Sequence, residues 1–251
     1  MIDSVGTAVA VLAAGMAAGT INTVVGSGTL ITFPTLLAVG LPPVTANVSN
    51  TIGLVPGSAS GAWGYRAELR GQRSRVLRFA SASVLGGVIG AVLLLRLPHS
   101  AFDAIVPALI GLGVLLVIFG PRISRRLNAH RTRSEEPNRW VWPAVAGTGV
   151  YGGYFGAAQG VILMAVLGIG IEDDLQRHNA LKNVLAALVN GVAAVIFIVV
   201  AHPDWRAVGL VALGSVVGGQ IGARVGRRLP PLVLRLVIVV VGVVAIVTFY
   251  V

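Results

Sequence analysis

The sequence predicts an all-α protein that crosses a membrane several times and consists of two homologous halves arranged as inverted repeats. Three observations predict this fold class. The 251 residues are 55% hydrophobic and only 11% charged, whereas a soluble domain carries about 25% charged residues. Several apolar runs reach the roughly 20 residues that a helix needs to cross a bilayer. The third observation is an internal repeat, in which each half begins with an apolar run interrupted by glycines.

The apolar segments, taken in order, define the expected helices. We place them at 5–25, 29–41, 45–65, 76–96, 101–120, 140–158, 160–171, 178–201, 205–224 and 231–251. The first segment lacks a basic start and carries Asp3, which favours a retained helix over a cleaved signal peptide. The segments 29–41 and 160–171 are too short to span a bilayer upright. Each therefore forms a broken or re-entrant pair with the segment before it.

The repeat has one fixed offset without a gap, in which residue i matches residue i + 132. Gly86–Ala91 matches Gly218–Ala223, and Arg96-Leu97-Pro98 matches Arg228-Leu229-Pro230. Shared glycines alone are weak evidence for a repeat in a Gly-rich chain. The six-residue block and the Arg-Leu-Pro match at one offset are stronger evidence, because they are hard to obtain by chance. The same offset pairs Gly28 with Gly160, Asn47 with Asn179 and Gly15 with Gly147. We therefore predict a first transmembrane repeat over 1–120, a cytoplasmic Arg-rich linker over 121–139 and a second transmembrane repeat over 140–251. The paired glycine blocks predict tight helix–helix contacts.

Charge distribution indicates how the chain is oriented. The formal net charge is +10, Lys182 is the only lysine, and the arginines gather in loops at 66–78, 121–139 and 224–235. Arginine in short loops between apolar runs indicates the cytoplasmic side of a membrane rather than nucleic-acid binding. If both broken pairs return to their side of entry, the halves are inverted and all three loops face the cytoplasm. Eight conventional spans are the alternative, with parallel halves and the third loop on the opposite side.

Composition also excludes several chemistries. The chain has no cysteine, which excludes disulfides and thiol chemistry. Its four histidines are scattered without ligand spacing, so we expect no metal site and no cofactor. No nucleotide-binding motif is present. An intramembrane enzyme would need paired carboxylates or a nucleophile–base pair within the spans, which offer almost none. We therefore expect no enzymatic activity.

The glycine breaks predict a binding site. Non-helical backbone at membrane depth survives only when it is buried in protein or lines a wet cavity, and transporters build sites from such discontinuous helices. The alternative is that the glycines only allow close helix packing. If the breaks instead form a binding site, the free backbone N–H groups at each break attract an anion without any charged residue.

At these residues the chain resembles the sulfite exporter TauE/SafE family, also described as four-TMS sulfate/sulfonate permeases. The resemblance covers nearly the whole chain, although Ser27 stands where the family usually has glycine. It implies a membrane transporter that moves sulfite, sulfonates or related anions, generally outward. It rests on the segments Gly26–Pro34, Ala46–Ser49, Gly61–Tyr65, Tyr151–Gly156 and Asn179–Asn183.

The candidate substrate-binding residues come from both breaks and from the polar runs that follow them. They are Gly26, Ser27, Gly28, Thr29, Asn47, Ser49, Asn50, Thr51, Gln159, Gly160, Asn179, Lys182 and Asn183. The polar run could instead cap a helix near the interface. Lys182 lies where the repeat places Asn50, and could either neutralise an oxyanion or extend to the lipid headgroups.

The predicted function is a secondary transporter of the cell membrane that exports a small sulfur-containing anion, of the sulfite, sulfonate or sulfoacetate type, by alternating access. The alternatives are an anion channel and a transporter of another small organic anion. The expected partners are the anion, the lipid bilayer and protons as a coupling ion, with no nucleic acid. The sequence leaves the oligomeric state open.

Overall fold

The computed structural model describes residue 2 and residues 4–128 and 139–225, and every regular element in these ranges is a helix. This confirms the predicted all-α class. The last predicted segment, 231–251, lies outside the described residues. The helices are α1 (Val5–Val24), α2 (Thr29–Ala38), α3 (Pro43–Gly64), α4 (Arg73–Arg96), α5 (His99–Asn128), α6 (Val141–Tyr154), α7 (Gln159–Gly170), α8 (Leu175–Val200) and α9 (Trp205–Val225).

Two helix boundaries differ from the sequence prediction for identifiable reasons. Helix α8 begins three residues before the expected position, because Asp174 caps it by accepting a hydrogen bond from the Gln176 N–H. Helix α5 continues to Asn128, so the first residues of the predicted linker 121–139 are helical. Residues 129–138 of that linker lie outside the described residues.

Four of the described helices, α1, α4, α8 and α9, are long and apolar enough to cross a membrane. Large apolar side chains on the outer faces of α4 and α9 are exposed, among them Leu85, Leu213 and Val217, as lipid-facing positions require. Helices α2 and α7 have 10 and 12 residues. Because a helix rises only about 1.5 Å per residue, neither can cross the hydrocarbon core, as the sequence predicted.

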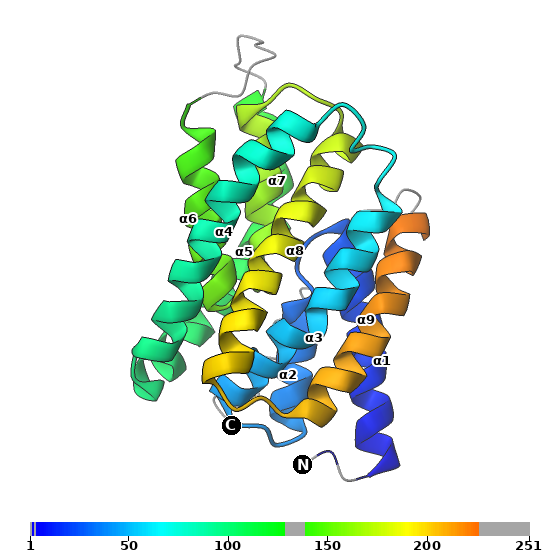
Figure 1. The fold of residues 1–251 in the computed structure, drawn as a ribbon, viewed down its shortest axis with the longest axis vertical. Coiled ribbons are helices and arrows are strands. Elements are labelled where there is room, and N and C mark those ends of the chain that lie inside the picture. The colour runs from blue at the N-terminus through cyan, green and yellow to red at the C-terminus, as the bar shows by residue number, and fades with distance from the viewer. Residues whose placement is uncertain (1, 3, 129–138, 226–251) are drawn as a thin grey trace.

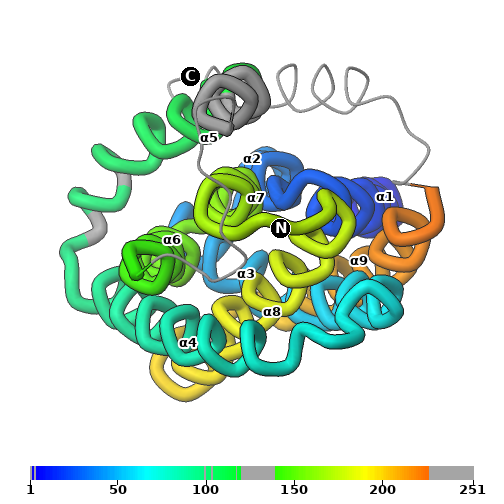
Figure 2. Tube along the Cα trace, turned by 90° about the horizontal axis from the view of Figure 1, so that it is seen from above, coloured from blue at the N-terminus to red at the C-terminus, as the bar shows by residue number. Residues whose placement is uncertain are grey.

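Helices α3 and α8 lie between two outer pairs, α1 with α9 and α4 with α6 (Figure 2). Helices α1, α3 and α9 run in the same direction, because residues one turn further along each helix contact residues one turn further along the others. Gly15 of α1 and Gly53 of α3 both pack against Val211 of α9. Four residues later, Gly19 and Gly57 both pack against Ser215. Helices α4 and α6 also run alongside each other in a common direction, from Gly86 against Ala146 to Gly90 against Val150.

The two sets of helices are antiparallel. The end of α3 and the end of α9 meet the start of α8, where Tyr65, Ala180 and Ala223 form one buried cluster. In Figure 1 the α1–α2 pair returns to the end of the molecule near the N-terminus, whereas the α6–α7 pair returns to the opposite end. The α3–α4 loop and the end of α9 also lie at that opposite end.

Glycine forms the closest helix contacts, as the paired glycine blocks predicted. A Cβ added at Gly86 or Gly90 of α4 would collide with carbonyl oxygens of α6, and one at Gly218 would collide with the Met16 carbonyl oxygen of α1. Small residues let helices approach closely in lipid, where there is no hydrophobic drive for association. These contacts therefore fix the outer pairs.

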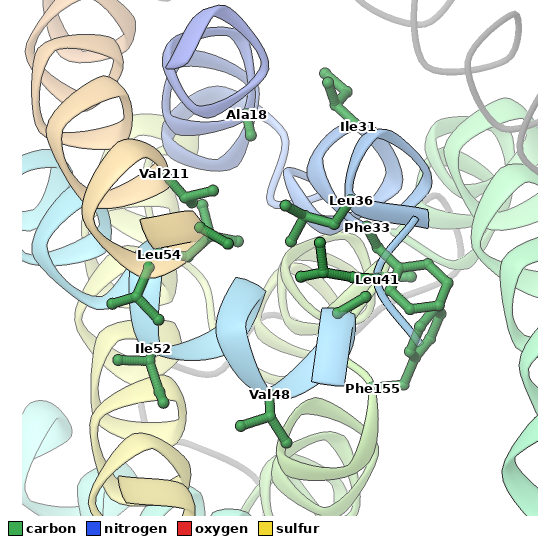
Figure 3. Packing of buried hydrophobic residues seen from close by; sticks show 14 of the residues in the cluster. Ala18, Ile31, Phe33, Leu36, Leu41, Val48, Ile52, Leu54, Phe155 and Val211 are labelled. Carbon is green, nitrogen blue, oxygen red and sulfur yellow. The ribbon is translucent and has the colours of Figure 1, made fainter. Parts of the chain in front are cut away.

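Aromatic packing joins the two broken pairs. Phe33 of α2 packs edge-on against Phe155, which directly follows α6, with ring centroids 5.1 Å apart. Figure 3 shows these two rings beside Leu36 and Leu41. Buried aromatic pairs of this geometry contribute about 0.5–1.5 kcal/mol beyond their buried area. The contact therefore holds α2 against the second break.

Candidate functional site

The two helix breaks have the same backbone geometry. In the first, the N–H groups of Val25 and Gly26 both donate to the Ile21 carbonyl oxygen, and Gly26 has a φ of 88°. In the second, Phe155 and Gly156 both donate to the Tyr151 carbonyl oxygen, and Gly156 has a φ of 73°. Positive φ favours glycine, so each glycine ends one helix and turns the chain toward the next.

The predicted gapless offset holds for some helices but not for the breaks. The starts of α3 and α8, Pro43 and Leu175, keep the offset of the repeat, as do the starts of α4 and α9. The equivalent glycines of the breaks, Gly26 and Gly156, are closer together in the sequence than this offset. The difference arises because α7 has 12 residues and α2 has 10. The pairing of Gly28 with Gly160 is therefore wrong.

The two breaks touch each other at the centre of the molecule. The Gly160 N–H donates to the Gly26 carbonyl oxygen at 3.0 Å. A Cβ on either glycine would collide with the backbone of the other. Gly28 instead packs on α1, where an added Cβ would lie 2.6 Å from the Ala18 carbonyl oxygen. Close packing, the alternative reading of these glycines, therefore explains all three.

Three side chains of α8 cap the end of α1. Lys182 Nζ donates to the carbonyl oxygens of Asn22, at 3.0 Å, and Thr23, at 3.1 Å. Asn179 and Asn183 donate to the same Thr23 oxygen from 3.3 and 3.2 Å. A helix C-terminus has unpaired carbonyls and a partial negative charge, which a cation stabilises. Lys182 is 0% exposed, so the alternative reading, in which it extends to the lipid headgroups, is wrong.

The end of α6 has a neutral cap. Asn47 of α3 donates to the Tyr154 carbonyl oxygen at 3.0 Å, which corresponds to the bond from Asn179 to the end of α1. Asn50, at the position equivalent to Lys182, contacts α2 instead. Its side chain donates to Thr29 Oγ1 at 3.2 Å and accepts from Thr32 Oγ1. The two breaks thus differ in charge, because only one carries a lysine.

Two predicted residues have structural partners away from the breaks. Ser49 Oγ accepts the Asp204 N–H at 2.8 Å and so holds the α8–α9 connection. Thr51 donates to the Asn47 carbonyl oxygen within α3. The helix-capping reading of the polar run is therefore wrong: α3 begins at Pro43 without a side-chain cap, and Asn47 instead donates to the C-terminal end of a distant helix.

Sequence reasoning missed a polar group between α1, α3 and α8. Asn22 and Asn190 both donate to Ser58 Oγ, from 3.2 and 3.3 Å. Ser58 and Asn190 are themselves 132 residues apart, so equivalent positions of α3 and α8 touch. The repeat offset, applied to polar residues inside apolar runs, would have identified this pair.

Four buried polar atoms at the breaks have no hydrogen-bond partner in the described part of the chain. They are Ser27 Oγ, Gln159 Nε2, Asn47 Oδ1 and Asn179 Oδ1. The backbone N–H groups of Ser27, Gly28 and Thr29, at the start of α2, also form no hydrogen bond among the described residues. Buried polar groups are normally paired, so these free groups make the breaks a candidate for binding a ligand.

A cluster of charges lies where the α7–α8 connection meets the start of α4. The Asp173 carboxylate pairs with Arg75 and accepts from Arg177 Nε at 2.7 Å. We call Arg75, Asp173 and Arg177 the ionic clamp. Arg177 Nη1 also donates to the Arg70 carbonyl oxygen, and Gln72 donates to the Arg177 carbonyl oxygen. The clamp thereby ties the α3–α4 loop to the start of α8.

Among the described residues, no group of three or more histidines, cysteines or acids could hold a metal ion. The buried polar and charged side chains of the described residues include no carboxylate. What the centre offers is hydrogen-bond donors: the unpaired N–H groups at the start of α2, the Gln159 amide and the Ser27 hydroxyl, together with the Lys182 ammonium at the end of α1. Such a group of donors suits the binding of an anion better than acid–base chemistry.

Comparisons with known proteins show similarity to membrane transporters. The sequence model described as Sulfite exporter TauE/SafE matches residues 11–249. A "Probable membrane transporter protein" of Haemophilus influenzae is 26% identical over 84% of this chain and 81% of its own length. "Probable membrane transporter protein YfcA" of Escherichia coli K12 is 28% identical over 85% of this chain and 77% of its own length. "Probable membrane transporter protein ORF9" of a Sinorhizobium species is 26% identical over 90% and 85%. No solved structure matches.

Proposed function

The chain belongs to the sulfite exporter TauE/SafE family of multi-pass cell-membrane transporters, and from this premise we propose that it exports a small sulfur-containing anion by alternating access. Sulfite, sulfonates and sulfoacetate are the substrate types. One observation carries the proposal: two broken helices meet at a buried centre that holds unpaired donors. The unpaired N–H groups at the start of α2 and the side chains of Ser27 and Gln159 would contact the anion.

The other predicted residues have supporting roles in this proposal. Gly26, Gly28 and Gly160 let the breaks approach. Asn47, Asn179, Lys182 and Asn183 hold the ends of α1 and α6, while Asn50 and Thr29 fix α2. Lys182 also supplies a positive charge, and two of its three ammonium protons are used by carbonyls.

Flux measurements in vesicles would test the proposal. Purified protein in liposomes loaded with sulfite or sulfoacetate should exchange labelled anion across the membrane, with a rate that saturates. Counterflow, in which unlabelled anion inside accelerates the uptake of labelled anion, is expected of a carrier. A flux that never saturates and shows no counterflow would favour the channel, and flux of carboxylates alone would favour another organic anion. A pH gradient that changes the flux would identify protons as the coupling ion.

We further propose that residues 1–120 and 140–251 are inverted repeats. The support is that α1 runs opposite to α6, and α3 opposite to α8, while each pair occupies equivalent places about the centre. Rocking of one repeat against the other would expose the site alternately to each side.

Single cysteines in this Cys-free chain would report the orientation. Gln72, a candidate position from the sequence alone, is buried, and Ser134 and Leu229 lie outside the described residues. We call the end of the molecule that carries the α3–α4 loop and the end of α9 the Arg-rich end. The exposed residues Ser74 and Val225 lie at this end, and the exposed residue His202 lies at the opposite end. In intact cells we expect an impermeant maleimide to label His202→Cys and to spare Ser74→Cys and Val225→Cys. Labelling of Val225→Cys with Ser74→Cys protected would instead support parallel halves.

The ionic clamp would act as a gate at the Arg-rich end in this mechanism. Asp173→Asn removes the charge that pairs with both arginines, so this end should open more often. In inside-out vesicles, we expect maleimide labelling of a Ser27→Cys variant to accelerate on the order of tenfold, which corresponds to about 1.4 kcal/mol. Glu172→Gln, which changes the neighbouring exposed carboxylate, is the matched control. Equal labelling in both variants would show that the clamp does not gate the site.

The clamp should persist at neutral and mildly acid pH. Partial burial alone would raise the pKa of the Asp173 carboxyl, but the Asp174 N–H and the guanidinium groups of Arg177 and Arg75 hold that pKa below its ordinary value. A carboxyl with a lowered pKa stabilises the folded state above its unfolded pKa, and this contribution is lost as the pH falls through the folded pKa. Relative to the exposed Ser74→Cys, whose labelling corrects for the falling thiolate fraction, labelling of Ser27→Cys should therefore not change between neutral pH and the folded-state pKa of Asp173.

A further inference from the structure

We propose that the site at the two breaks selects oxyanions carrying one negative charge and rejects those carrying two. This inference rests on the proposed function and deepens it, because it fixes the charge of the substrate: of the proposed types it selects simple sulfonates and hydrogen sulfite and rejects sulfoacetate, which carries two negative charges at neutral pH. It follows from counting the charges that surround the centre.

Lys182 is the only lysine or arginine side chain buried within the described residues. Their arginines are exposed or half-buried at the two ends of the molecule, and the buried polar side chains include no carboxylate. In its ammonium form, which two carbonyl oxygens at the end of α1 and a bound anion would stabilise, Lys182 contributes a single formal charge that no buried acid of the described residues neutralises. Its hydrogen bonds go to the backbone of α1, so the charge stays within the centre.

The four helix ends at the breaks cancel one another. A helix carries roughly half a positive charge at its N-terminus and half a negative charge at its C-terminus. The starts of α2 and α7 and the ends of α1 and α6 meet here, so two positive and two negative ends sum to about zero. With Lys182 included, the centre carries a net charge of about +1.

Unpaired donors at the centre support the binding of an anion there. Ser27 is 0% exposed and Gln159 is 4% exposed, yet Ser27 Oγ and Gln159 Nε2 have no partner in the described part of the molecule. Both residues lie at the start of a half-helix, Ser27 before α2 and Gln159 as the first residue of α7. An anion placed there would accept hydrogen bonds from the groups that are now unpaired.

One negative charge neutralises this centre, whereas two do not. A bound monoanion would leave the buried region neutral overall. A dianion would leave one uncompensated negative charge, and the desolvation penalty of a buried ion is several kcal/mol even after relaxation. The position equivalent to Lys182 holds Asn50, so the other repeat supplies no second cation.

Methanesulfonate and sulfate form a matched pair for testing this inference. Both are tetrahedral and similar in size, but methanesulfonate carries one charge and sulfate carries two. Binding to the purified full-length protein would be measured by calorimetry at pH 7.5 and constant ionic strength. We expect methanesulfonate to bind at least ~10-fold more tightly than sulfate, a difference of about 1.4 kcal/mol. Lys182→Arg, which keeps the charge, should keep this preference, and Lys182→Gln should lose it by weakening methanesulfonate.

The outcomes separate the inference from the function on which it rests. Equal or tighter binding of sulfate by the unmodified protein would overturn the charge selection but leave an anion site in place. Failure of both anions, sulfite and sulfoacetate to bind would overturn the site itself. Because the comparison of the two anions uses the unmodified protein, it decides the inference even where a Lys182 variant does not fold.

Discussion

Gly26→Ala is expected to remove most of the folded protein from the membrane. Gly26 has a φ of 88°, and a left-handed conformation costs an L-residue about 1–2 kcal/mol. Its new methyl group would also collide with the backbone of Gly160, and forcing atoms into a packed site costs typically about 1–3 kcal/mol. Backbone cannot move aside as a side-chain tip can. We therefore expect a total loss of roughly 2–5 kcal/mol.

Two further variants separate the causes of that loss. Gly160→Ala introduces the same collision but at a residue without positive φ, so it should be destabilising by the packing term alone. Gly147→Ala, within α6 and with no atom near its Cβ, should be neutral or slightly stabilising. Thermal unfolding in detergent, with the yield of monodisperse protein, would measure all three. If Gly26→Ala matches Gly147→Ala in stability, the breaks do not meet as the structure has them.

Lys182→Gln is expected to weaken anion transport by about 10–100-fold, because the centre loses its single formal charge. Removing a charge that interacts through an effective dielectric near 20 corresponds to on the order of 1–4 kcal/mol. The amide can still donate to one carbonyl of α1. If it donates to Thr23, whose oxygen also accepts from Asn179 and Asn183, the Asn22 carbonyl oxygen loses its side-chain partner. An unpaired buried carbonyl costs about 1–3 kcal/mol, so stability should fall as well.

Comparison with Lys182→Arg and Lys182→Met separates charge from capping. Arginine keeps the charge but needs more room than a fully buried ammonium, so it should restore anion binding only in part. Methionine removes both the charge and the hydrogen bonds, and should be the least stable of the three variants. Initial rates of anion efflux from liposomes, normalised to folded protein, would give the transport effect. Normal efflux by Lys182→Gln would leave the helix N-termini and amides as the whole anion site.

Local patterns in the sequence were sufficient for the fold class. Apolar runs of about 20 residues form helices because lipid offers no other partner for backbone groups, and the short runs became α2 and α7. Glycine at Gly26 marked the first break because only glycine takes positive φ readily. The fixed offset of the repeat identified which of α3, α4, α8 and α9 correspond. These signals depend on neighbours along the chain, so they can be read without knowing the packing.

The contacts between distant helices were decided only in three dimensions. A buried lysine can face lipid headgroups, a substrate or a helix end, and the sequence contains nothing that distinguishes these fates. The structure places Lys182 on the end of α1, 160 residues away from its partner Asn22. Asn47 likewise caps α6 and not its own helix. The pairing of Gly26 with Gly160 arises in the same way, because which backbones touch depends on how whole helices pack.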